Sequence, residues 1–210
     1  RKKKFELIIV DDNSNDGTSE ILEKYHKKNF HHIIRRSKRD LSKSCILGFS
    51  KAKFEYIIVM DGDLQHKPSD INKILHAFFK YSPDIVVGTR DLFKPKKHNL
   101  NFFRLFASRM LILTVNLLLG NKTSDPMSGF FMFKKSLFEK SQKKMIKKGY
   151  KILLDILYVQ NQKIKVVDVK INFDSRKKGA SKMSYKILFN LISMILKKFH
   201  TKFSILIFKN

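Results

Sequence analysis

The sequence predicts an α/β fold, with a mostly parallel sheet flanked by helices, and three patterns support this prediction. Short apolar runs alternate with amphipathic stretches through the first half of the chain. Three of the apolar runs end in acidic or other polar residues, which is typical of strands whose ends bind ligands. The second half holds longer amphipathic segments. No repeat or flexible linker interrupts the 210 residues, so one domain is expected.

The apolar periodicity predicts the order of the elements along the chain. Strands of the first half are expected at 5–10, 32–35, 56–60 and 84–88, and helices at 18–28, 40–53 and 69–79. Ser69 is expected to cap the last of these helices. The second half predicts helices at 100–119, 135–147, 150–160 and from Tyr185 onward, a loop and strand over 125–133, a strand at 165–173, and a basic loop at 175–182.

The chain carries a large positive charge, with 44 Lys and Arg against 18 Asp and Glu and a formal net charge of +26. Such a surface attracts nucleic acid, anionic lipid headgroups or phosphorylated substrates, although a lysine-rich proteome would account for part of the excess. We find no zinc-ligand spacing, aromatic nucleic-acid motif or recognition helix, so a nucleic-acid partner is not expected. Cys45 is the single cysteine, which excludes a disulfide framework and fits a reducing location.

Two long apolar segments, 100–119 and 187–208, suggest contact with a membrane. Two arginines interrupt the first, and four basic residues interrupt the second. Neither segment therefore offers the roughly 20 uninterrupted apolar residues of a spanning helix. We expect both to lie on a membrane surface or to pack within the domain. The expected location is the cytoplasmic face of a membrane, peripheral unless spans follow Asn210.

Acidic residues follow two of the predicted strands. The segment 11–17 comes after the first strand, and Asp61 and Asp63 come after the third. Carboxylates gathered at one edge of a sheet repel one another unless a cation neutralises them, and a divalent ion bridging a diphosphate would do so. Mg²⁺ and Mn²⁺ prefer such oxygen ligands. A lone Asp-x-Asp is usually a capped turn, but two acidic strand ends in one sheet favour a metal and a nucleotide.

Seven motifs follow one another between about residues 5 and 185: Val10-Asp11-Asp12-Asn13-Ser14-Asn15-Asp16-Gly17-Thr18, Asp61-Gly62-Asp63-Leu64-Gln65 with Pro68, Val87-Gly88-Thr89-Arg90, Arg104 with Ser108, Asp125-Pro126-Met127-Ser128-Gly129-Phe130, the segment 151–157, and Arg176-x-x-Gly179-x-Ser181-Lys182-Met183. In this order they resemble the motifs of family-2 glycosyltransferases of the dolichol-phosphate mannosyltransferase and polyprenyl-phosphate glycosyltransferase type. Members of that family begin with a further strand, which is expected before Arg1.

The resemblance implies a GT-A fold, with a Rossmann-like, mostly parallel sheet flanked by helices and with C-terminal amphipathic helices. It implies a single catalytic domain over 1–210. About 1–90 would bind the nucleotide sugar, and about 91–210 would bind the acceptor and carry interfacial helices. The implied reaction moves a sugar, mannose or glucose, from a nucleotide-diphosphate sugar to a polyprenyl or dolichyl phosphate, with inversion and with Mg²⁺ or Mn²⁺. The implied partners are these two substrates and a membrane surface.

The resemblance also implies roles for individual residues. The nucleotide-binding residues would be Asp11, Asp12 and Asp61, and the metal ligands Asp61, Asp63 and Gln65. The catalytic residues would be Asp61, Asp63, Arg90 and Asp125. The acceptor phosphate would be bound by Arg90, Arg104, Ser108, Arg176, Ser181 and Lys182. Asp125 and Asp155 would orient sugar hydroxyls or a basic residue, or else cap a loop and lie on a solvated helix face.

Two other functions fit part of the pattern. A family-2 enzyme acting on a soluble or cell-surface glycan would need a general base, for which Asp155 is the candidate. A receiver-like signalling domain would use Asp11, Asp12, Asp61 and Thr89 as a phosphoacceptor site. Asp63 and the hundred or so residues after Thr89 argue against the receiver.

Overall fold

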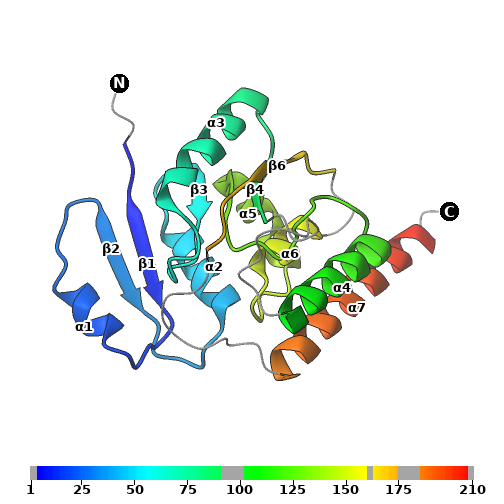
Figure 1. Ribbon diagram of the computed structural model, residues 1–210, viewed down its shortest axis with the longest axis horizontal. Coiled ribbons are helices and arrows are strands. Elements are labelled where there is room, and N and C mark those ends of the chain that lie inside the picture. Colours follow the sequence, from blue (N-terminus) through cyan, green and yellow to red (C-terminus); the bar gives the residue numbers. More distant parts are fainter. Residues whose placement is uncertain (1–3, 91–101, 160–162, 175–184, 208–210) are drawn as a thin grey trace.

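The computed structural model describes residues 4–90, 102–159, 163–174 and 185–207 (Figure 1). The elements of the first half are β1 (Leu7–Asp11), α1 (Thr18–Glu23), β2 (Phe30–Ile34), α2 (Leu41–Lys51), β3 (Tyr56–Val59), the 3-10 turn η1 (Pro68–Asp70), α3 (Ile71–Tyr81) and β4 (Ile85–Thr89). Those of the second half are α4 (Phe102–Leu119), β5 (Phe131–Lys134), α5 (Lys135–Ser141), the 3-10 turn η2 (Gln142–Lys144), α6 (Ile152–Leu157), β6 (Val166–Lys170) and α7 (Tyr185–Ile207).

Each of these helices and strands overlaps a segment predicted to have that structure, but some boundaries differ. The helix predicted at 18–28 ends at Glu23, and the one predicted at 135–147 gives way to a 3-10 turn after Ser141. The cap predicted at Ser69 is wrong, because η1 begins at Pro68 and runs directly into α3. Proline is suited to the first position of such a turn, since its φ is already fixed near the helical value.

The strands form two hydrogen-bonded sheets. In the first, β1 pairs in parallel with β2, and in the second the order is β3-β5-β4-β6. β6 is parallel to β4, whereas β5 is antiparallel to both of its neighbours. The direction of β5 follows from where it starts: the amide of Gly88, near the end of β4, donates to the carbonyl of Phe130 at 2.8 Å. The loop before β5 is thereby held at the carboxyl ends of β3 and β4.

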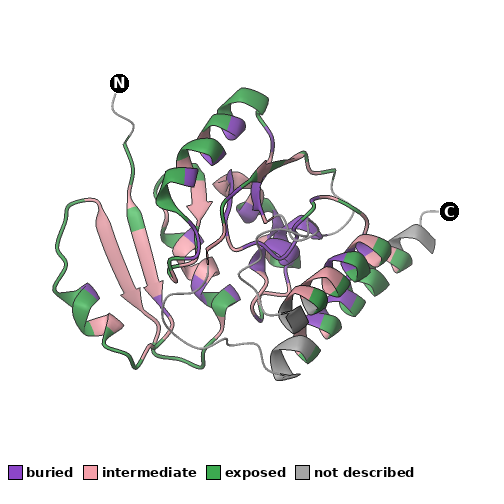
Figure 2. Cartoon of the chain, viewed as in Figure 1, coloured by how far each residue is buried: buried purple, intermediate pink, exposed green. Residues whose placement is uncertain are grey.

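Two apolar layers cover the four-stranded sheet. Alternate residues of β4 and β5 face opposite sides, as the pleat of a strand requires. One side packs against helices α2, α4, α6 and α7, and the other against α3. All five residues of β4 are buried, whereas β1 and β2 are mostly half-buried (Figure 2).

Helices α4 and α7 lie side by side at one flank of the molecule (Figure 1). Ile112 and Val115 of α4 are buried in the same apolar cluster as Leu191 and Ile195 of α7. Over the described residues, no helix combines the length and the apolar character that crossing a membrane demands.

Candidate active site at the carboxyl ends of the strands

Asp11, the last residue of β1, organises the loop that follows it. Its buried carboxylate accepts hydrogen bonds from the amide and the hydroxyl of Ser14 and, at 2.9 Å, from the hydroxyl of Ser19. Burial acts to raise the pKa of Asp11, but the bonds from Ser14 and Ser19 outweigh it and lower the pKa below its ordinary value. The carboxylate is therefore turned into its own loop, and its predicted role in nucleotide binding stays a prediction.

Asp12 joins the end of β2 to the start of α2. It forms an ion pair with Arg35, directly after β2, and accepts the amide of Asp40 at 2.6 Å. Asp40 in turn caps α2 by accepting the amide of Lys43, and it also accepts the amide of Gly149 at 3.1 Å. These contacts tie the loops after β1 and β2 to the segment that precedes α6.

Asp61 lies in the loop after β3, in a partly enclosed position. Its side chain is 44% exposed, and its carboxylate packs against the backbone of Gly129 from the loop before β5. Partial desolvation by the surrounding protein raises the pKa of Asp61, although the positive charges of Lys151 and His66 oppose this rise. A cation bound at Asp61 would relieve the unfavourable ionisation.

The rest of the Asp61 loop turns sharply. Asp63 is half-buried, and its carboxylate accepts the amide of Gln65 at 3.2 Å. Leu64 between them has φ 62°, a left-handed conformation that is rare for a bulky residue, and its side chain is exposed. Backbone outliers of this kind gather at functional sites.

Gln65 is buried and connects this loop to the segment after β6. Its side-chain nitrogen donates to the backbone carbonyl of Asp174 at 3.0 Å, and its backbone carbonyl accepts the amide of Asp174 at 2.9 Å. The carboxamide oxygen is thus the atom that would serve as a metal ligand. The pairing also brings the segment 171–174, which follows β6, beside the Asp61 loop.

Arg90 and Asp125 form a bidentate ion pair at the end of β4. Nε and Nη2 of Arg90 donate to the two oxygens of the fully buried Asp125 at 2.6 and 2.9 Å. Burial acts to lower the pKa of Arg90, but the charge and hydrogen bonds of Asp125 outweigh burial and raise the pKa above its ordinary value. The guanidinium also lies over the ring of Phe173, at 5.2 Å from its centroid. The ion pair fits one of the two functional roles predicted for Asp125, the orientation of a basic residue, and that role stays a prediction.

Lys151 is a charged residue of the site to which the sequence analysis gave no role, although it begins the motif at 151–157. Its ammonium donates to the carbonyl of Met127 at 3.0 Å. Burial lowers the pKa of Lys151 and the nearby Arg90 lowers it further, while Asp61 and Asp125 raise it. Lys151 thus lies within electrostatic reach of both carboxylates. The signal that could have indicated its role is a lysine directly before 152–157, a stretch that is apolar except for Asp155.

Asp155 lies on α6, one turn after Lys151, and its side chain contacts α7 and the segment before α6. It is fully buried and forms an ion pair with Lys198 of α7 at 2.7 Å, and it accepts the amides of Ile146 and Lys147 at 3.1 and 2.8 Å. The prediction of a solvated helix face is wrong, because α6 is enclosed on all sides. The alternative prediction, that Asp155 orients a basic residue, fits the ion pair with Lys198.

The ends of β1 and β3 face the same edge of the molecule. Burial, together with the negative charges of Asp61, Asp12 and Asp40, raises the pKa of the Cys45 thiol on α2 to about 12. Three carboxylates from different loops therefore act electrostatically on one residue of α2. Figure 1 shows the arrowheads of β1, β2 and β3 pointing the same way.

The remaining predicted acceptor-phosphate residues cannot be placed against this edge. Ser108 is half-buried on α4, and Arg104 belongs to the same helix, but its side chain lies outside the described residues. Arg176, Ser181 and Lys182 also lie outside them. Their roles stay predictions.

The donor set fits a hard divalent cation that is shared with a ligand. Among the residues that the structure places, no three His, Cys, Asp or Glu side chains gather to enclose a metal ion. Asp61 and Asp63 offer two carboxylates on one turn. Mg²⁺ is commonly bound in this way, by one or two carboxylates together with phosphate oxygens and water.

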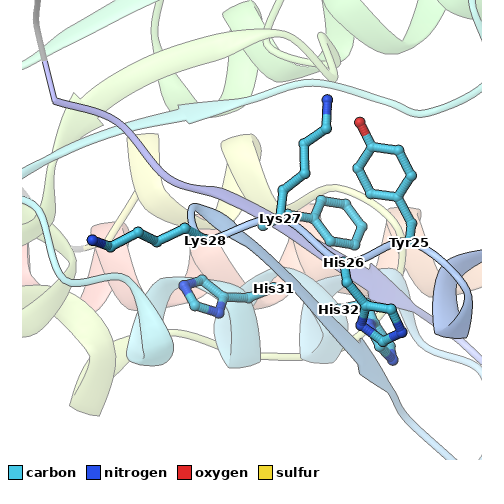
Figure 3. Close-up of a pocket in the computed structure, with 7 residues that line it drawn as sticks. Tyr25, His26, Lys27, Lys28, His31 and His32 are labelled. Carbon is cyan, nitrogen blue, oxygen red and sulfur yellow. The ribbon is translucent and has the colours of Figure 1, made fainter.

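A separate hollow lies at the opposite end of β2. It is lined by Tyr25, His26, Lys27, Lys28, Phe30, His31 and His32 (Figure 3). These residues come before or at the start of β2, whereas Arg35 and its partner Asp12 follow the ends of their strands. The hollow is therefore not part of the candidate active site.

Comparisons with known proteins show which family the chain resembles. Residues 1–142 match the model of glycosyl transferase family 2. A dolichol-phosphate mannosyltransferase of Pyrococcus furiosus is 36% identical over 194 residues, which are 91% of this chain and 54% of the relative. The Saccharomyces cerevisiae dolichol-phosphate mannosyltransferase is 31% identical over 216 residues, covering 96% of this chain and 77% of the relative. The chain thus spans about half of the first relative and three quarters of the second.

Solved structures show the fold. Glucosyl-3-phosphoglycerate synthase from Mycobacterium tuberculosis, in complex with Mn²⁺, UDP-glucose and phosphoglyceric acid, aligns with a TM-score of 0.68 at 12% identity, over 92% of this chain and 68% of the other. This likeness confirms the predicted α/β fold of the GT-A type. Because the family model covers about two thirds of the residues and the relatives exceed 30% identity over nearly all of them, this chain belongs to glycosyl transferase family 2.

Proposed function

We propose that the chain transfers a sugar, with mannose the first candidate and glucose the second, from a nucleoside-diphosphate sugar to the phosphate of a dolichol or another polyprenol. The observation that carries the proposal is the similarity of the chain to two dolichol-phosphate mannosyltransferases over more than nine tenths of the chain's length. The arrangement of charges around Asp61 supports it independently, since acidic and basic side chains meet at one edge of the strands.

The donor side of the site would be formed by the loops after β1 and β3. Asp61 and Asp63, with the side-chain oxygen of Gln65, would hold Mg²⁺ or Mn²⁺, and Asp11 and Asp12 would lie near the nucleotide. When bound, the ion would offset the charge that develops on the leaving diphosphate. The Lys151 side chain lies close enough to Asp61 for the two groups to interact electrostatically. About 1–90 would thus form the nucleotide-sugar half of a single catalytic domain over 1–210.

The acceptor side would be formed by basic residues of about 91–210 together with Arg90. A phosphate monoester has a second pKa of about 6 and is largely a dianion near neutral pH, so it needs no strong general base. Its oxygen attacks the sugar carbon while the bond to the diphosphate breaks, and this single displacement inverts the configuration. Asp125 holds Arg90 in place for the acceptor. Arg104, Ser108, Arg176, Ser181 and Lys182 would complete the phosphate site.

A glycan acceptor is less consistent with the structure. A hydroxyl nucleophile needs a general base, and Asp155 was the candidate for that role. Asp155 is fully enclosed and paired with Lys198, so it is not placed to receive a proton from an incoming hydroxyl. This observation supports a phosphate acceptor.

Helices α4 and α7 offer a surface for the membrane that would contain such a lipid. Each presents an exposed apolar stripe at helical spacing: Phe106, Met110, Leu113 and Leu117 on α4, and Phe189, Ile192, Leu196, Phe199 and Phe203 on α7. Neither helix carries an acidic residue. Large apolar stripes flanked by basic residues suit the interface of an anionic membrane. We include this surface, at the cytoplasmic face, in the proposal.

The proposal is tested by sugar transfer to dolichyl phosphate, using labelled GDP-mannose and UDP-glucose in parallel with MnCl₂. Asp63→Ala should lower the rate by at least ~100-fold, the size of effect seen when charge stabilisation of a transition state is removed. Glu23→Ala, which alters an exposed carboxylate on α1, serves as the control. Undiminished transfer by Asp63→Ala would refute the assignment of the metal site. Absence of transfer from both donors by the unaltered chain would refute the proposed reaction.

A further inference from the structure

His66 is a buried histidine that the proposed reaction does not use. It is 3% exposed and lies between two phenylalanine rings, with ring centroids 5.3 Å from Phe130 and 5.1 Å from Phe173. A position enclosed by aromatic rings is one in which an apolar side chain would ordinarily pack. The presence of two polar nitrogens there therefore calls for a physical reason.

The two nitrogens of His66 differ in their surroundings. Nε2 faces the carboxylate of Asp61, at 3.9 Å from Oδ2. Nδ1 is buried and has no hydrogen-bond partner within the described part of the chain. A neutral imidazole carries one N–H, and placing it on Nε2, toward the carboxylate, leaves Nδ1 as an unsatisfied acceptor. A phenylalanine would fill the same space without that cost, so the gain from the imidazole lies on the Asp61 side.

The backbone of His66 is held in place by the segment that follows β6. His66 and Phe173 form an isolated antiparallel bridge, and the neighbouring Gln65 and Asp174 exchange two further hydrogen bonds. The ring of Phe173 contacts His66 on one side, and the guanidinium of Arg90 lies over the same ring. One short segment thus supports both the Asp61 side and the Arg90 side of the site.

We propose that His66 is a positioning residue that orients the carboxylate of Asp61 toward the divalent cation and diphosphate, an inference that rests on the proposed function. The distance of 3.9 Å is too long for a hydrogen bond, but such contacts in unliganded sites commonly shorten when the ligand binds. The backbone of Gly129 limits movement of the carboxylate on one side, and a small rotation toward Nε2 would shorten the contact with His66.

Two substitutions separate this role from a purely structural one. His66→Gln places a side-chain N–H near the position of Nε2, whereas His66→Phe keeps the packing between the rings and removes the donor. His76→Gln and His76→Phe are the matched controls, because His76 is exposed on α3. The readouts are the Mn²⁺ affinity in the presence of GDP, and separately UDP, by electron paramagnetic resonance titration, and the Tm of each variant.

His66→Phe should weaken Mn²⁺ binding about 10-fold while its Tm is unchanged or higher, because the unsatisfied Nδ1 is removed. His66→Gln should restore binding to within about 3-fold of the unaltered chain. The inference is overturned if His66→Phe binds Mn²⁺ as well as the unaltered chain, or if both variants lose binding and Tm together. If the unaltered chain fails to bind Mn²⁺ both in the presence of GDP and in the presence of UDP, the proposed function fails, and the inference fails with it.

Discussion

The carboxylate of Asp61 lies directly against Gly129, a residue 68 positions later in the chain. A Cβ at position 129 would come within 2.8 Å of Oδ1 and closer still to Cγ and Oδ2 of Asp61. Real side chains do not approach so closely, so either the loop after β3 or the loop before β5 would have to move. The absence of a side chain at 129 is therefore a condition for the position of Asp61.

Gly129→Ala should displace Asp61 and lower sugar transfer by at least ~10-fold, since a small misplacement of a binding group costs one to two orders of magnitude. It should also lower the Tm, because the overlap forces one of the two loops to move. The stability control is Gly62→Ala, where an added Cβ would meet nothing within 4 Å. Equal melting temperatures and equal Mn²⁺ affinity for Gly129→Ala and the unaltered chain would contradict this steric argument.

The Arg90–Asp125 pair should be strongly coupled. Asp125→Asn leaves the guanidinium of Arg90, only 14% exposed, without its compensating charge, and we expect a loss of roughly 2–4 kcal/mol in the free energy of unfolding. Arg90→Gln alone should also destabilise, by leaving Asp125 unpaired. The double variant should lose less than the sum of the two, as interacting pairs do. Urea denaturation of the four proteins measures the coupling, and additive losses would show that the pair is not energetically linked.

Lys198→Met should destabilise the chain without removing its chemistry. The substitution leaves the enclosed carboxylate of Asp155 without its cation, at a cost of about 3 kcal/mol. Lys197→Met, its exposed neighbour on α7, should change stability by less than about 0.5 kcal/mol. Transfer measured well below the Tm should be nearly equal in both. A specific loss of transfer in folded Lys198→Met would mean that this pair acts in the reaction after all.

Asp11 should make folding stability depend on acidity. Its pKa in the folded state lies below the ordinary value of 3.8, so the unfolded chain takes up this proton first as the pH falls. The stability that Asp11 contributes is thus complete above about pH 4 and is lost as the pH falls through the folded-state pKa. Ser19→Ala removes one of its donors and should reduce this acid-dependent loss, while Ser50→Ala should not. Urea unfolding between pH 5 and pH 2 measures it, and identical slopes for all three proteins would contradict the assignment.

The acidic strand ends could be predicted from the sequence because the pattern is local: an apolar run and the carboxylates that follow it lie within ten residues. The contacts that decide what each side chain does are not local. Gln65 meets Asp174 across 109 residues, and the antiparallel direction of β5 depends on where the loop at 125–130 returns to β4. The solvated face predicted for Asp155 is wrong because nothing in the sequence of α6 reveals that Lys198 covers it from another helix. Spacing therefore predicts which residues gather at the edge, and long-range packing decides how each one is oriented.

The stripes on α4 and α7 should bind membranes through residues that do not stabilise the fold. Leu117 is 85% exposed and Phe203 is 54% exposed, so replacing either with Gln should leave the Tm within about 2 °C. Complete burial of such a side chain in an apolar phase is worth about 1.5–3 kcal/mol, so partial immersion predicts a roughly 10-fold weaker association for the double variant. Co-sedimentation with vesicles of phosphatidylcholine and phosphatidylglycerol measures the loss. Ile21→Gln changes an apolar residue that is 69% exposed on α1, beside the two-stranded sheet, and this variant should bind as the unaltered chain does. If Ile21→Gln weakens vesicle binding as much as the Leu117 and Phe203 changes do, the apolar contribution to membrane binding is not specific to α4 and α7.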